Sequence, residues 1–255
     1  MSTEALLLSA MMAVAAGLVG CFAVMRRMAL AGDAFSHVAL PGIGVALALH
    51  VHPMLGAIAM LFFGALLVWA LDDASHVATE TVIGVVFSAA LAIGTMTTSG
   101  EELVDALLGQ PAAVSRTEVA FGLIASIVVI AFVLRNKHAL VIALVSPDIA
   151  RTADINVKRL NLIYLQMFAL TVALGLRYLG VLLMGSLIIV PAATAKRLSS
   201  NLNQMLMLSA LFAVTATLGG ASFGWWLQRE TGPLIVTIAA AGFIVTFAWR
   251  RREGA

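Results

Sequence analysis

The sequence predicts an all-α polytopic membrane protein with about eight or nine transmembrane helices. Of its 255 residues, 62% are hydrophobic and 11% are charged, and the mean hydropathy is +1.04. Soluble domains carry about 25% charged and about 45–50% apolar residues, so a soluble class is excluded. The apolar residues also fall in long uninterrupted blocks, and a helix needs about 20 such residues to cross ~30 Å of hydrocarbon.

Nine apolar runs are candidates for the membrane-spanning helices. The four longer runs cover residues 5–25, 54–71, 81–99 and 231–249, and the five others cover 34–49, 119–134, 160–176, 178–195 and 202–227. The first run lacks a preceding basic segment and is long enough to span, so we expect a retained helix rather than a signal peptide. No linker or low-complexity segment separates the runs, and we therefore expect one transmembrane domain over residues 1–255.

The basic residues predict an orientation for these spans. With nine spans and the N-terminus outside, all Lys and Arg residues fall in the cytoplasm except Arg116, Arg177 and Arg229. Trp225 and Trp226 then lie at the outer membrane interface, where aromatic side chains are enriched. The same arrangement places the C-terminus in the cytoplasm.

Three features of the composition and sequence exclude some classes of function. Cys21 is the only cysteine, which excludes an intramolecular disulfide and a cysteine-rich zinc site. The sequence contains no GxxxxGK[ST] phosphate-binding loop, so we do not expect the chain to hydrolyse ATP by that mechanism. The net charge of +2 and the pI near 9.0 follow from the loop bias, and no nucleic-acid partner is expected.

Asp33 and His37 are the first candidate site residues. They stand four positions apart at the start of an apolar run, where ionisable side chains are costly without a function. One helical turn would let both face the same side and offer an oxygen and a nitrogen ligand to one divalent cation. The competing interpretation is that Asp33 caps a helix and His37 satisfies a buried carbonyl. Two ligands are too few for a tight site, so a transient stop on a pathway is the metal function to expect.

Two apolar runs are interrupted by proline, at Pro41-Gly42 and at Pro191-Ala192. A proline inside a helix leaves one backbone carbonyl without its usual donor. Broken helices of transporters often border the substrate path, whereas a plain kink is an equal alternative. Small residues around both prolines also favour close helix packing.

His50 and His52 lie at the expected outer end of the second span. They are possible outer-mouth metal contacts, because a binding protein could deliver a cation there. Residues two apart at a helix end do not share a face, however, so solvated side chains are the favoured interpretation.

The longest cytoplasmic stretch begins with a helix-start signature, Ser146-Pro147-Asp148. It combines a capping hydroxyl, a proline at the first helical position and an acid near the positive end of the helix dipole. We expect a short surface helix over about 147–158 that turns Ile149 and Ala150 to one face and Arg151 away from it. Such a helix lies on lipid or docks in a groove of a partner, and the pattern does not choose between them.

Four segments, in order along the chain, resemble the metal-uptake ABC transporter permeases, which carry zinc, manganese or iron. The two longer segments are GDAFSHVALPGIG (32–44) and LGVLLMGSLIIVPAATAKR (179–197). The two shorter ones are LLGQPAAVSRTEV (107–119) and SPDIARTADINVKRL (146–160). The resemblance covers the whole chain. Two departures are Gln110, where relatives often have an acid, and Asp154, where many have glycine.

The resemblance implies a permease subunit of the bacterial cytoplasmic membrane, surrounded by lipid. It further implies a homodimer, two cytoplasmic ATP-binding subunits and an extracytoplasmic metal-binding protein. Asp33 and His37 fall on the family's membrane metal-site positions, and residues 147–158 on its coupling helix, with Asp148, Ala150 and Arg151 facing the ATPase.

The expected cargo is a divalent metal, zinc before manganese or iron, with no permanently bound cofactor. Two alternatives remain at this stage: a secondary carrier in which Asp33 couples to an ion gradient, and a permease for chelated iron or a vitamin.

Overall fold

The computed structural model describes residues 3–28, 30–75, 77–97, 116–179, 181–228 and 231–253, and of residues 3, 177–179, 181–183 and 247–253 it describes the backbone alone. Within these ranges every regular element is a helix, which confirms the all-α prediction. Residues 107–115 of the motif LLGQPAAVSRTEV, including Gln110, lie outside the described ranges. The helices are α1 (Thr3–Met25), α2 (Ala31–Ala48), α3 (Pro53–Ala74), α4 (Thr79–Thr97), α6 (Arg116–Val145), α7 (Pro147–Thr152), α8 (Val157–Leu179), α9 (Val181–Leu198), α10 (Leu202–Leu227) and α11 (Thr231–Glu253).

Each of the nine apolar runs lies mainly within one long helix. Seven helices in the described ranges are long and apolar enough to cross a membrane, judged by length and composition: α1, α2, α3, α4, α6, α8 and α10. The other two expected spans are α9, with 18 residues, and α11, whose apolar part Thr231–Thr246 is shorter. The prediction of a polytopic all-α membrane protein with about eight or nine spans agrees with this set of seven candidate spans and two shorter apolar helices.

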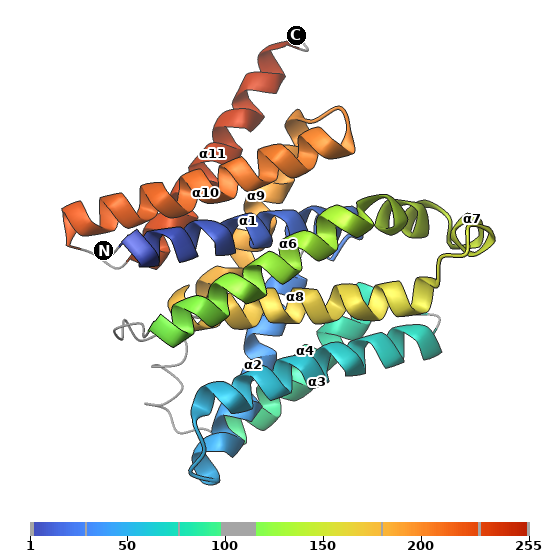
Figure 1. Cartoon of the computed structure of the whole chain (residues 1–255), viewed down its shortest axis with the longest axis vertical. Coiled ribbons are helices and arrows are strands. Elements are labelled where there is room, and N and C mark those ends of the chain that lie inside the picture. Colours follow the sequence, from blue (N-terminus) through green and yellow to red (C-terminus); the bar gives the residue numbers. More distant parts are fainter. Residues whose placement is uncertain are drawn as a thin grey trace.

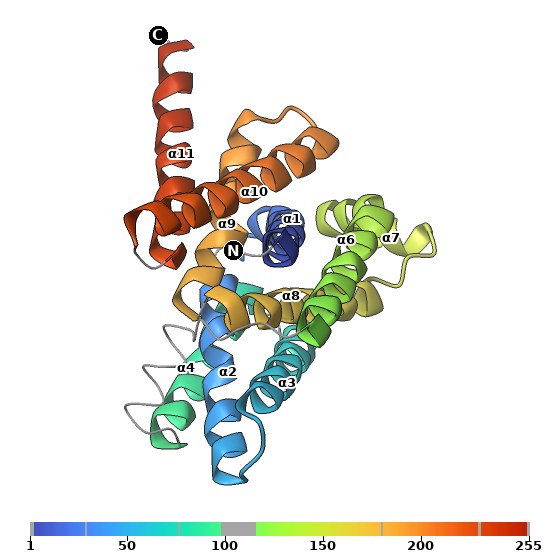
Figure 2. The same cartoon turned by 60° about the vertical axis from the view of Figure 1, so that its left-hand side comes forward.

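The helices fall into two groups that run in different directions and cross each other. In Figure 1, α1, α3, α6, α8 and α10 run nearly side by side, whereas α2, α9 and α11 run across them. Figure 2 shows α1 almost end-on and α2 and α9 again upright. Helix α2 packs against α3, α4 and α9, and α9 in turn packs against α1, α10 and α11. The two long sequence motifs, on α2 and α9, thus meet in the middle of the bundle.

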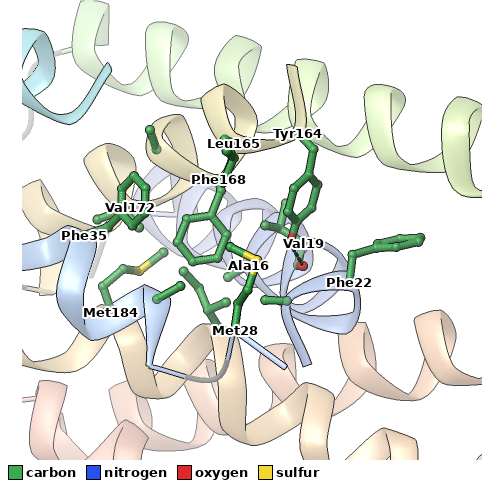
Figure 3. Close-up of a cluster of buried hydrophobic side chains, with 14 of the residues drawn as sticks. Ala16, Val19, Phe22, Met28, Phe35, Tyr164, Leu165, Phe168, Val172 and Met184 are labelled. Carbon is green, nitrogen blue, oxygen red and sulfur yellow. Dashed lines mark hydrogen bonds between the residues drawn. The ribbon is translucent and has the colours of Figure 1, made fainter. Parts of the chain in front are cut away.

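The core lies where α1, α2, α8 and α9 cross, and it is aromatic. Phe22, Phe35, Tyr164 and Phe168 are fully buried, with ring centroids of Phe35 and Phe168 5.4 Å apart (Figure 3). Such rings bury large apolar areas and prefer the edge-to-face geometry seen here. By contrast, large apolar side chains on the outer faces of α3, α6 and α10 are exposed, as expected of surfaces that face lipid.

Candidate metal centre

Asp33 lies in the first turn of α2. The N-cap residue, Leu30, has an αR backbone and forms no side-chain capping bond, and the Asp33 side chain is exposed. A carboxylate in the first turn of a helix lies near the positive end of the helix dipole, which interacts favourably with its charge. The alternative in which Asp33 caps the helix does not describe this geometry.

A small cavity opens beside Asp33, between the start of α2 and α4. Its volume is about 140 Å³, and its walls come from the start of α2, from Met28 before it and from the first half of α4. Most of the lining is apolar, including Met28, Ile83 and Phe87. Two acidic residues, Asp33 and Glu80, are part of the lining. Two hard oxygen donors in a small apolar cavity favour a cation over a neutral or anionic molecule.

Glu80 is a residue that reasoning from the sequence missed. It stands in the first turn of α4, as Asp33 does in α2, and both side chains are exposed. An acid just before an apolar run was the signal available for it, and the same signal identified Asp33. Only the packing of α4 on α2 shows that the two acids share a cavity.

His37 lies one turn further along α2, at the edge of this region. Its ring centroid is 5.5 Å from that of Phe87, which lines the cavity, although His37 itself is not part of the lining. Its Nδ1 atom is buried and has no hydrogen-bond partner among the described residues. The alternative in which this nitrogen satisfies a buried carbonyl therefore does not hold for Nδ1. A buried ring nitrogen without a partner is a costly feature that a bound cation would relieve.

A single copy of the chain does not complete a metal site within the described ranges. No group of three or more His, Cys, Asp and Glu side chains there lies close enough to hold an ion. Asp33 and His37 alone would supply two ligands, which are too few for a tight metal site.

Neither proline breaks its helix. Pro41 lies inside α2 and Pro191 inside α9, and both helices are continuous. Pro41 nevertheless has no N–H to donate to the carbonyl of His37, four residues earlier. Gly42 permits close packing of α2 on α3, because a Cβ there would collide with the backbone of Gly56. Ala192 is fully buried. Close packing is thus the observed role of both motifs.

His50 and His52 have backbone roles at the far end of α2. His50 takes a left-handed conformation with φ of 54°, and the N–H of Val51 donates to the Ala46 carbonyl at 2.8 Å, which closes the helix. The Nδ1 atom of His52 accepts from the Met54 N–H at 3.3 Å and caps α3. Asp33 and His50 are separated by about 25 Å along the helix at 1.5 Å per residue, so they do not form one site.

The expected surface helix is α7, and its start is as predicted. The Ser146 hydroxyl accepts from the Ile149 N–H at 3.3 Å, and Pro147 occupies the first turn. Asp148 and Arg151 form an exposed ion pair of 3.0 Å. Ala150 is buried, whereas Ile149 is 61% exposed, so the two do not share one buried face as expected. Figure 1 shows α7 projecting at one end of the molecule.

The end of α7 differs from the prediction, because the helix stops at Thr152 rather than near residue 157 or 158. Asp154 has φ of 55°, in the left-handed region. The Ile155 N–H donates to the Ala150 carbonyl at 3.0 Å and the Asp154 N–H to Arg151 at 3.2 Å. These two bonds form a Schellman motif, whose left-handed position usually holds glycine. Asp154 thus occupies, with some strain, the conformation for which glycine is the natural residue.

A polar cluster near the cavity was also missed. Arg26, which the sequence places on the cytoplasmic side, is half-buried, and its Nη1 donates to Asn161 Oδ1. Asn161 Nδ2 donates to Asp72 Oδ2 at 3.4 Å, and Thr79 Oγ1 donates to Asp72 Oδ1 at 2.6 Å. The cluster joins the end of α1 to α3, α4 and α8. Thr79 directly precedes Glu80 in the chain.

Several membrane proteins of transport systems are similar to this chain in sequence. The manganese transport system membrane protein MntC of Listeria monocytogenes is 28% identical over 98% of this chain and 91% of its own length. The high-affinity zinc uptake system membrane protein ZnuB of Haemophilus influenzae is 28% identical over 92% of both chains. The chelated iron transport system membrane protein YfeD of Yersinia pestis is 31% identical over 92% of this chain and 81% of its own.

A solved structure, PsaBC from Streptococcus pneumoniae in complex with Fab, superimposes with a TM-score of 0.81 and 27% identity, covering 96% of this chain and 90% of the other. The profile of the ABC 3 transport family matches residues 1–250. The resemblance seen in the motifs is thereby confirmed. The chain belongs to the ABC 3 transport family.

Proposed function

We propose that this chain is the transmembrane permease subunit of an ATP-driven importer of divalent transition-metal cations. The observation that carries the proposal is the cavity that Asp33 of α2 and Glu80 of α4 both line, with the unpartnered Nδ1 of His37 one turn beyond Asp33. Ionised carboxylates and a neutral imidazole are ligands for a partly dehydrated cation, and too few are present to retain it permanently.

The nature of the metal follows only in part from this chemistry. Mixed oxygen and nitrogen ligands suit zinc, manganese and ferrous iron alike, and relatives named for manganese, zinc and iron match this chain at similar identity. The preference for zinc drawn from the sequence therefore has no support, and we propose the class rather than one ion. The cavity of about 140 Å³ is small for a chelate, since pockets for organic ligands commonly hold about 300–1,000 Å³.

We infer that a second copy of the chain completes the site. Asp33 and Glu80 are exposed on the single chain, and the described part of one copy lacks a third ligand beside them. Paired copies would place a second set of donors opposite the first, and most soluble oligomers form such two-fold pairs. The transported ion would then be held between two protomers and released when they move.

We propose that the energy comes from separate ATP-binding subunits that dock at α7. The chain has no phosphate-binding loop of its own. The end of α6 exposes the side chain of Val145, and α7 exposes those of Ile149 and Arg151, at one end of the molecule. A structure titled PsaBC, similar over 96% of this chain, supports an assembly of this kind. An extracytoplasmic binding protein would deliver the metal at the other end. The proposed location is the cytoplasmic membrane, with the N-terminus outside and the C-terminus inside.

The test is uptake of labelled manganese and zinc by bacteria that lack other importers and express this chain with its binding protein and ATPase. We expect Asp33→Ala and His37→Ala to abolish uptake and Glu80→Gln to reduce it, with normal amounts of permease in the membrane. Glu4→Gln is the matched control, because Glu4 is also an acid in the first turn of a helix, α1, and lies outside the cavity lining. Normal uptake by both Asp33→Ala and His37→Ala would refute the site.

The same cells separate the proposal from a secondary carrier. An ATP-driven importer loses uptake when its ATPase subunit is deleted and keeps it when an uncoupler is added at constant ATP. The reverse pattern would mean that Asp33 couples transport to an ion gradient.

A further inference from the structure

The two long sequence motifs touch through their backbones at one point, Gly32 of α2 and Gly185 of α9. A Cβ added to Gly185 would lie 2.7 Å from the backbone N of Asp33 and 3.0 Å from its Cα. A Cβ added to Gly32 would lie 2.8 Å from the Cα of Gly185. Because these neighbours are backbone atoms, a side chain cannot rotate away to make room. The first turn of α2 therefore rests directly on α9.

The α9 side of this contact is itself fixed. Met184, the residue before Gly185, is buried and reaches the aromatic cluster near Phe35 and Phe168 (Figure 3). A Cβ on Gly175 of α8 would collide with the Met184 side chain, so α8 and α9 are also in close contact there. Close-packed interiors transmit such displacements because they hold few voids. A side chain at residue 185 could push α9 away from α2 only by disturbing this packing. We therefore expect the first turn of α2 to be displaced instead.

The magnitude of that movement matters for a metal ligand. Relief of the contact from 2.7 Å to about 3.4 Å, where van der Waals contact becomes ordinary, requires about 0.7 Å of displacement. Metal–ligand distances tolerate about 0.2 Å, so a shift of this size at Asp33 would misplace its carboxylate. Glu80 lies on α4, across the cavity, and would not follow.

We propose that Gly185 is a positioning residue for the transport site: the bare backbone of α9 at this point sets the place of the Asp33 carboxylate, and thereby the affinity and selectivity for the cation. The inference rests on the proposed function. It gives a function to the second long motif, on α9. This motif is remote in sequence from the candidate ligands and contributes no ligand itself.

The first experiment measures uptake of manganese and zinc by the complete transporter in cells. We expect Gly185→Ala to raise the KM at least tenfold for one metal and to change the ratio of the two metals, with permease abundance within about twofold of wild type. Gly32→Ala, which fills the same contact from α2, should act alike.

The matched control is Gly17→Ala. A Cβ on Gly17 of α1 would lie 2.9 Å from the Ser209 carbonyl oxygen of α10, an equally tight backbone contact between helices that do not carry the cavity. It should lower abundance or thermal stability without changing KM or the metal ratio. Equal kinetic effects of Gly17→Ala and Gly185→Ala would overturn the proposal, as would an effect of Gly185→Ala on abundance alone.

A second experiment reads the position of residue 33 without transport. Cys21 is the only cysteine and is buried, so a Cys21→Ala background carries a single thiol once Asp33→Cys is added. We expect Gly185→Ala to change the rate at which a charged methanethiosulfonate labels this thiol several-fold, and Gly17→Ala to leave it unchanged. If the wild-type transporter does not transport metal, the proposed function is wrong. The labelling rate at residue 33 still tests whether Gly185 sets the position of that residue. An unchanged rate overturns the proposal, as does failure of both Gly185→Ala and Gly32→Ala to accumulate while Gly17→Ala does.

Discussion

The guanidinium carbon of Arg26 lies 4.5 Å from the centroid of the Tyr164 ring, so the charge at the end of α1 stacks on the aromatic core. The Tyr164 hydroxyl in turn donates to the Val19 carbonyl at 3.1 Å. Burial lowers the pKa of Arg26, and the nearby Asp72 carboxylate opposes that shift. Arginine remains charged in proteins, so the half-buried cation depends on its polar partners.

Replacement of Asn161 by leucine should destabilise the protein by about 1.5–3 kcal/mol, the usual effect of removing a hydrogen bond to a charged group. Asn161 accepts from Arg26 and donates to Asp72, and leucine offers neither. Thermal unfolding of the purified permease measures the effect. Asn203→Leu is the control, because Asn203 accepts from Lys137 at 2.7 Å in an exposed pair, and its loss should cost less than about 1 kcal/mol. Equal losses in the two variants would contradict the role given to burial.

Asp154→Gly should stabilise the protein by about 1 kcal/mol. The left-handed conformation costs an L-residue about 1–2 kcal/mol and glycine almost nothing. Ala153→Gly tests the reverse, since Ala153 has φ of −93° and gains nothing from glycine. Denaturant midpoints for the two variants should move in opposite directions. A lower midpoint for Asp154→Gly would mean that the aspartate makes a contact that offsets its backbone strain.

Loss of the cap in Ser146→Ala should weaken α7 by about 0.5–2 kcal/mol, the range for N-cap substitutions. A six-residue helix has little other local stabilisation, so we expect it to fray and the permease to stimulate its ATPase several-fold less. ATP hydrolysis by the reconstituted complex is the measurement. Ser88→Ala removes a hydroxyl that bonds only within its own helix, to the Gly84 carbonyl, and should leave hydrolysis unchanged. Full stimulation by Ser146→Ala would separate α7 from the docking site.

Added metal should raise the melting temperature of the purified permease, and a chelator should reverse the rise. A ligand at 100 times its Kd stabilises by about 2.7 kcal/mol, which corresponds to several degrees for a chain of this size. Asp33→Asn should melt at the same temperature with and without manganese or zinc, because it lacks the charged donor. A shift of wild-type size in Asp33→Asn would place the bound ion elsewhere.

The helices were largely predictable from the sequence because hydrophobic blocks and capping chemistry are local. The start of α7 was read from Ser146 and Pro147, and both take the expected positions. Its end was not, since an aspartate rather than a glycine takes the left-handed turn at residue 154. The two prolines were possible breaks in their helices, whereas α2 and α9 both continue through them.

The candidate site was predictable only along one helix. The spacing of Asp33 and His37 is a property of α2 and shows in the sequence, whereas Glu80 joins them through the packing of α4. The contact of Gly185 with Asp33 likewise connects residues more than 150 positions apart, and no periodicity records it. The sequence did not show the burial of Arg26, because its partners, Asn161 and Tyr164 of α8 and Asp72 of α3, are remote from it along the chain.

Helix α6 has a mechanical consequence. Its 30 residues extend about 45 Å at 1.5 Å per residue, against about 30 Å of hydrocarbon, so a long stem separates α7 from the bilayer. The helix is continuous, and it rests on α1 and α8. If α6 moved as one rigid body, a sideways force on α7 would turn it about its contacts with α1 and α8, and the opposite end of α6 would swing the other way.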